Sequence, residues 1–104
     1  MKIELLWFDD CPNHEAAEQM LSDVLKEFGV SEPIQQIDVP DEATGNLVIF
    51  PGSPTIRIDG VDVEPGWVPC DDCTPRCRLY MTSEGLRVLP EKEWVRAAVE
   101  GALA

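Results

Sequence analysis

The chain has 104 residues, a formal net charge of −12, 44% apolar residues and 27% charged residues. A chain of this length has room for one modest core, so we expect a single domain over residues 1–104. The negative charge repels nucleic-acid phosphates and anionic lipid surfaces, so we expect neither nucleic acid nor membrane as a partner.

The first half of the chain predicts alternating strands and helices. Lys2 to Phe8 is a nearly continuous apolar run, typical of a strand buried on both faces of a sheet. From Pro12 to Phe28, apolar side chains recur with the spacing of an amphipathic helix. Pro33 to Val39 predicts a second strand, and Glu42 to about Phe50 predicts a short helix that Asp41 would cap.

The second half begins with a half-buried strand pattern at Thr55 to Asp59, which Asp59-Gly60 ends with a hairpin-type turn. The segment of about 64–77, from Glu64 to Cys77, holds three of the four cysteines and predicts a long loop. Arg78 to Thr82 predicts a further strand. After a turn and a short apolar stretch, Pro90 is well placed at the start of the last helix.

The expected order is therefore β-α-β-α-β-β-α, an α/β fold. Two strands joined through a helix should be parallel through a right-handed crossover, and the last pair should be antiparallel. This makes a mixed central sheet with helices on both faces.

One cysteine lies at the junction between the first strand and the first helix. The free N–H groups and the dipole of a helix N-terminus favour the thiolate of Cys11. His14, at i+3, would favour it further when protonated, whereas Asp9, Asp10 and Glu15 act against it. These opposing charges leave two readings open: a reactive thiol, or a small apolar residue at the start of a helix.

Two short segments resemble motifs of the thioredoxin superfamily, whose element order the chain shares over nearly its whole length. Residues Phe8 to His14 (FDDCPNH) are similar to the strand-to-helix corner that carries the redox motif. Ser53 to Thr55 (SPT) resembles the segment that bears the cis-proline. The stretch Gly52 to Arg57 (GSPTIR) further resembles small single-domain bacterial thioredoxin-like proteins, here with a Cys-x-x-His variant of the redox motif.

The resemblance implies a thioredoxin-like fold and thiol–disulfide exchange. It makes Cys11 the nucleophile and His14 its neighbour in the redox motif, with Pro54 in a cis peptide bond that aligns the backbone of the substrate. Because His14 stands where a dithiol protein has its second cysteine, release of the product would need an outside thiol or a loop cysteine. The expected partner is a thiol or disulfide substrate, either a protein or a small molecule.

No targeting segment and no run of ~20 apolar residues is visible in the sequence, so we expect a cytoplasmic protein. Thiols are kept reduced there, and four cysteines then indicate redox chemistry or metal binding before a structural disulfide.

The loop cysteines Cys70, Cys73 and Cys77 have the spacing C-x₂-C-x₃-C. Two cysteines two residues apart form the common half of a zinc site, so the alternative function is binding of zinc or a soft metal without catalysis. A fourth ligand would come from Cys11, His14, Asp71, Asp72 or water. A disulfide between two of the three, with one free thiol, is the other reading, and a third is a redox-inactive scaffold for protein interaction.

Topology separates the two groups of cysteines. Pro54, at the start of its strand, should lie near Cys11, whereas Cys77 would begin the neighbouring strand at the opposite end of the sheet, about 15 Å away at ~3.3 Å per residue. The two centres would meet only if the loop folds back along the sheet, for which it is long enough. The arginines Arg57, Arg76 and Arg78 are expected to pair with surface carboxylates, and nothing in the sequence predicts an oligomeric state.

Overall fold

A computed structural model describes residues 1–9, 11–70 and 73–104 of the chain. The elements follow in the order β1-α1-β2-α2-β3-β4-β5-β6-α3. The strands are β1 (Ile3–Trp7), β2 (Gln35–Asp38), β3 (Thr55–Ile58), β4 (Val61–Asp62), β5 (Tyr80–Thr82) and β6 (Gly85–Arg87). The helices are α1 (His14–Glu27), α2 (Glu42–Val48) and α3 (Lys92–Leu103).

The central sheet has four strands in the order β2-β1-β3-β4. Strand β1 is parallel to β2 and antiparallel to β3, with Leu6 opposite Ile37 on one side and opposite Thr55 on the other. The turn from β3 to β4 has positive φ at both Asp59 and Gly60, as a two-residue hairpin requires. The described residues thus form a mixed α/β fold around a mixed sheet.

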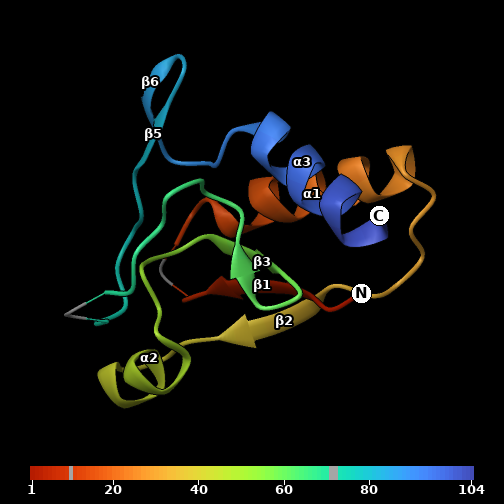
Figure 1. Cartoon of the computed structure of the whole chain (residues 1–104). Coiled ribbons are helices and arrows are strands. Elements are labelled where there is room, and N and C mark those ends of the chain that lie inside the picture. The colour runs from red at the N-terminus through yellow and green to blue at the C-terminus, as the bar shows by residue number, and fades with distance from the viewer. Residues whose placement is uncertain (10, 71–72) are drawn as a thin grey trace.

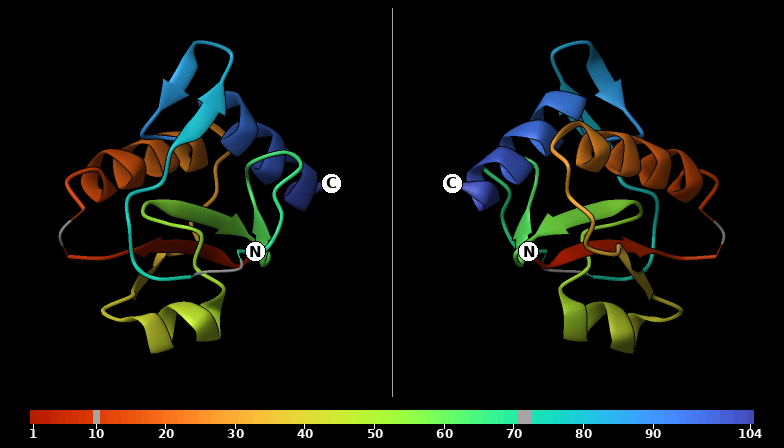
Figure 2. Two further views of the ribbon diagram at one scale, coloured as in Figure 1. Left: turned by 90° about the vertical axis from the view of Figure 1, so that its left-hand side faces the viewer. Right: turned by 90° about the vertical axis from the view of Figure 1, so that its right-hand side faces the viewer.

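Helices cover both faces of this sheet: α1 and α3 lie on one face and α2 on the other (Figure 1; Figure 2). The larger core joins β1 and β3 to α1 and α3, and its fully buried members include Ile3, Leu21 and Val99. A smaller core of Leu6, Val39 and Phe50 lies on the side of α2. Within the part of the chain that the structure describes, no helix has the length and apolar character that a bilayer crossing needs.

The helix boundaries follow local chemistry. Helix α1 begins at His14, two residues later than the apolar pattern predicts, with Asn13 as its N-cap. Helix α2 begins where it was expected, because the carboxylate of Asp41 accepts the backbone N–H of Thr44 at 2.8 Å.

The segment after the long loop corrects our prediction. We expected 78–82 to be the antiparallel neighbour of β3, but β4 takes that place, and β5 pairs with β6 in a separate hairpin that stands out from the body (Figure 1). The chain folds back before the hairpin. The Ser53 N–H donates to Arg76 O at 2.7 Å, and the Arg78 N–H donates to Ser53 O at 2.8 Å. Cys77 therefore pairs with Ser53 at the Pro54 end of β3, and its predicted position at the opposite end is wrong.

Candidate functional site

Cys11 lies in the corner between β1 and α1. Its backbone N–H donates to the carbonyl oxygen of Phe8 at 3.0 Å, in the turn that leads from the sheet to the helix. Its sulfur accepts the backbone N–H of Asn13 at 3.4 Å. This contact ties the sulfur to the turn that precedes α1. Only 2% of the residue's surface is exposed, so solvent and large substrates have little direct access to this sulfur.

His14 contacts the backbone of the same corner. Its ring stacks on Trp7, with ring centroids 4.6 Å apart and 13° between the planes. Its Nδ1 lies 3.1 Å from the carbonyl oxygen of Cys11. Because a carbonyl oxygen only accepts, Nδ1 carries the proton in this hydrogen bond. Through these two contacts His14 holds the corner in shape.

The Ser53–Pro54 peptide bond is cis, as the resemblance implied. Pro54 is buried, and its carbonyl oxygen accepts the hydroxyl proton of Tyr80. Strands β1 and β3 are antiparallel, with Leu6 opposite Thr55. The end of β1 that leads to Cys11 and the start of β3 at Pro54 therefore meet at one end of the sheet.

Cys77 belongs to this same end. It is a free, exposed thiol, and its backbone pairs with Ser53, the residue before Pro54. The structure therefore brings two free cysteines, Cys11 and Cys77, to the end of the sheet at which the sequence placed Cys11 alone.

A buried ion pair anchors the Cys77 segment. The Arg78 residue is 6% exposed, and its Nη1 donates to Asp62 Oδ2 at 2.7 Å and to Thr55 Oγ1 at 2.9 Å. Its Nη2 donates to Asp62 Oδ1 and to Glu64 Oε1, each at 3.1 Å. The guanidinium also lies over the ring of Tyr80, 4.3 Å from its centroid. We predicted a surface pair for this arginine, and that prediction is wrong, because the Asp62 side chain is only 1% exposed.

Tyr80 is the only tyrosine of the chain. Burial raises the pKa of its hydroxyl above the ordinary value, against the smaller effect of Arg78, which lowers it. We expect its absorbance at 295 nm to titrate above pH 10 in the folded protein and near pH 10, the ordinary tyrosine value, in urea. The folded state favours the neutral hydroxyl of Tyr80. The contribution of Tyr80 to the free energy of unfolding should therefore stay constant below about pH 10, and the free energy should fall as the pH rises further. Equal midpoints in the two states would contradict this prediction.

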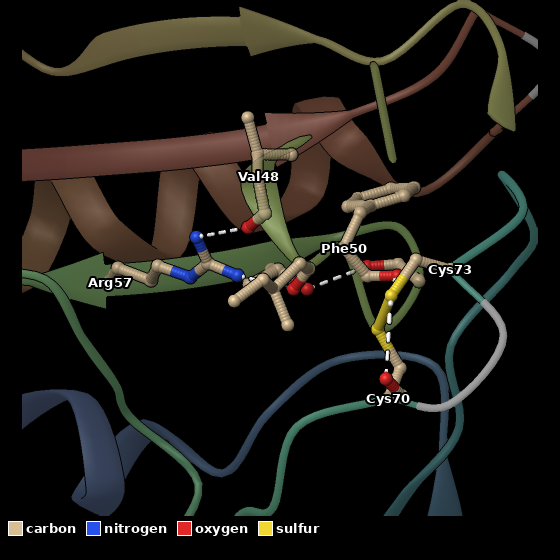
Figure 3. The surroundings of a disulfide bond; sticks show 8 residues. Val48, Phe50, Arg57, Cys70 and Cys73 are labelled. Atoms are coloured by element: carbon tan, nitrogen blue, oxygen red, sulfur yellow. Dashed lines mark hydrogen bonds between the residues drawn. A yellow bond between two sulfur atoms is a disulfide. The ribbon is translucent and has the colours of Figure 1, made fainter. Parts of the chain in front are cut away.

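Two of the loop cysteines, Cys70 and Cys73, form a disulfide, and Cys77 remains free. Figure 3 shows this disulfide beside Phe50, whose carbonyl oxygen is 3.5 Å from Cys70 Sγ. Cys73 Sγ lies 3.6 Å from the carbonyl oxygen of Cys70. Sulfurs in a disulfide carry no proton, so these two contacts become S–H···O hydrogen bonds only when the disulfide is reduced.

The zinc reading needs thiolates from Cys70, Cys73 and Cys77. Two of these sulfurs are bonded to each other, so reduction has to come before metal binding. Across residues 1–9, 11–70 and 73–104, no three His, Cys, Asp or Glu side chains gather closely enough to hold an ion. Asp71 and Asp72, considered as fourth ligands, lie outside the described residues.

Arg57, in β3, satisfies the end of α2. It donates to the carbonyl oxygens of Val48 at 2.8 Å and Ile49 at 2.7 Å, which the helix leaves free (Figure 3).

The disulfide loop packs against α2. A Cβ added to Gly45 would lie 2.0 Å from the carbonyl oxygen of Cys73. The loop backbone thus touches α2 at a position where only glycine fits.

No family model, no curated protein and no solved structure matches this chain.

Proposed function

We propose that the chain is a thiol–disulfide exchange protein with a thioredoxin-like fold, whose centre consists of Cys11, Pro54 and Cys77. The observation that carries the proposal is the pairing of Cys77 with Ser53, because it adds a free, exposed thiol to the end of the sheet at which Cys11 precedes α1. The order from β1 to β4, with a cis-proline just before β3, supports the thioredoxin-like fold.

Exposure divides the roles of the two thiols. The exposed Cys77 attacks the substrate disulfide, so that Cys77 Sγ bonds to one substrate sulfur and the other leaves as a thiolate. Cys11 then attacks the Cys77 sulfur, which releases the second substrate thiolate and leaves a Cys11–Cys77 disulfide. Two thiols of the glutathione class reduce that disulfide and are themselves oxidised. Cys11 thus takes the second step, in place of the first nucleophilic role that the resemblance implied.

The corner around Cys11 suits this second step. The Asn13 N–H donates to the sulfur at 3.4 Å and holds it in the turn before α1, and burial protects the sulfur from other oxidants. His14 holds the backbone of the corner through the Cys11 carbonyl oxygen, so its role is positioning.

Single cysteine-to-serine variants test these roles with 5,5′-dithiobis(2-nitrobenzoate) as the substrate disulfide. We expect Cys77→Ser to slow its reduction at least about tenfold, a change of ~1.4 kcal/mol in the barrier, because the exposed thiol makes the first attack. Cys11→Ser should still react once and accumulate a mixed disulfide on Cys77, visible as an added mass. The double variant Cys70→Ser/Cys73→Ser is the matched control and should keep the rate.

Three results would contradict the proposal in different ways. An unchanged rate in Cys77→Ser would remove Cys77 from the reaction, and a wild type without exchange activity would overturn the function. Binding of one zinc ion per reduced chain, lost in Cys73→Ser and found without exchange activity, would instead favour the metal-binding alternative.

A further inference from the structure

The chain that leads away from Cys77 presents an apolar face. From 77 to 81, exposure alternates strictly: Cys77, Leu79 and Met81 are exposed, whereas Arg78 and Tyr80 are buried. This is the period of an extended strand, in which every second side chain points to the same side. The free thiol and two exposed apolar side chains therefore follow one another on the same side of one segment.

The β5–β6 hairpin widens this face. Met81 lies opposite Leu86, and the same register continued by one pair puts Leu79 opposite Val88. Exposure is 61% for Leu79, 66% for Met81, 56% for Leu86 and 42% for Val88. We call these four residues the hairpin face. Figures 1 and 2 show the hairpin standing out from the rest of the molecule.

The two sides of the hairpin differ in what covers them. On the inner side, Tyr80 is fully buried, its ring lies 6.2 Å from that of Trp94, and its hydroxyl donates to Pro54. A two-stranded hairpin is marginally stable alone, and a contiguous exposed apolar surface typically marks an interaction site. The hairpin face is such a surface, and it begins two residues from the free, exposed thiol of Cys77.

We propose that the hairpin face docks the substrate of the thiol centre, and that this substrate is a polypeptide disulfide with apolar side chains close to its cysteine. This inference rests on the proposed function. Leu79 and Met81 lie about 7 Å and 13 Å along the chain from Cys77, at ~3.3 Å per residue. A small disulfide bonded to Cys77 does not span that distance, but an extended peptide does, with its apolar side chains on Leu79 and Met81.

Charge disfavours self-association at this face. The chain carries a net charge of −12, which repels a second copy of the chain. The occupant of the hairpin face is therefore a polypeptide disulfide, and the mixed disulfide at Cys77 forms as in the reaction proposed above.

Two model peptides test this. Both are linked through their cysteine to a thionitrobenzoate leaving group. One has leucine two and four residues from the cysteine, and the other has serine there. For the wild type we expect kcat/KM to be about tenfold higher with the leucine peptide, since burying part of two apolar side chains is worth ~1.4 kcal/mol. In Met81→Ser/Leu86→Ser the ratio should fall to about twofold or less, with the rate on 5,5′-dithiobis(2-nitrobenzoate) unchanged. Leu47→Ser, which changes an 84% exposed leucine on α2, is the matched control and should keep the tenfold ratio.

The outcomes separate the inference from the proposed function. If the wild type reduces neither the small disulfide nor the peptides, the function fails and the inference fails with it. If the small disulfide is reduced and the leucine preference is absent or survives in the double variant, only the inference is overturned. A wild-type dimer in sedimentation that Met81→Ser/Leu86→Ser converts to a monomer would assign the face to a second copy, and would also overturn it.

Discussion

Replacement of Arg78 by methionine is expected to lower the free energy of unfolding by about 3–5 kcal/mol, because it leaves a buried carboxylate without its partner. The side chain of Asp62 is 1% exposed and receives two hydrogen bonds from Arg78, and Glu64 and Thr55 lose one each. Domains of this size are stable by only about 5–15 kcal/mol, so the loss should be plain in urea denaturation followed by circular dichroism.

Two further variants test whether the loss of stability comes from the unpaired buried carboxylate and not simply from the removal of an arginine. Arg96→Met removes an exposed guanidinium that pairs with Glu27 and Glu93, and it should change the urea midpoint only slightly. Arg78→Met/Asp62→Leu removes the buried pair together, and we expect it to recover much of the lost stability. If Arg78→Met and Arg96→Met had the same small effect, the buried pair would not hold the Cys77 segment.

The buried pair of Arg78 and Asp62 also explains why the position of residues 78–82 was predicted wrongly. Alternation at 78–82 correctly predicts an extended segment, but alternation does not name the partner strand. Because of the Asp59-Gly60 turn, β4 pairs with the edge of β3 at which we expected residues 78–82. The buried contact between Arg78 and Asp62 then holds the segment around Arg78 beside the β3–β4 hairpin. Charged side chains are mostly exposed in proteins, so the sequence pattern does not indicate that Arg78 and Asp62 form a buried pair.

Elements decided by local pattern were predicted well. The apolar run of β1, the helical spacing of α1 and the carboxylate cap of Asp41 each act within a few residues, and each element formed near its predicted bounds. The site depended on longer contacts. The sequence indicated Cys11 and the cis peptide at Pro54, but the place of Cys77 beside Ser53 and the disulfide between Cys70 and Cys73 depend on how a long loop folds back. Spacing alone does not choose between a metal site and a disulfide.

Gly45→Ala is expected to destabilise the protein, although alanine is the better helix former. In an exposed helix this change would stabilise by about 1 kcal/mol. In α2, the new Cβ would lie 2.0 Å from the carbonyl oxygen of Cys73, and a backbone atom held by the Cys70–Cys73 loop has little freedom to move away. Overpacking of this kind costs typically 1–3 kcal/mol, so the sign of the effect should reverse.

Gly101→Ala is the matched control for this reversal. Gly101 lies in α3, and a Cβ added there meets no atom within 4 Å, so the same substitution should raise the urea midpoint. Reduction of the disulfide gives a second comparison, because a loop freed from its cross-link can yield to the added methyl group. We therefore expect the penalty of Gly45→Ala, measured against wild type, to shrink when both are kept in dithiothreitol. A stabilising Gly45→Ala would show that α2 and the disulfide loop are not in contact, and a penalty unchanged by reduction would show that the disulfide does not fix the Cys73 backbone.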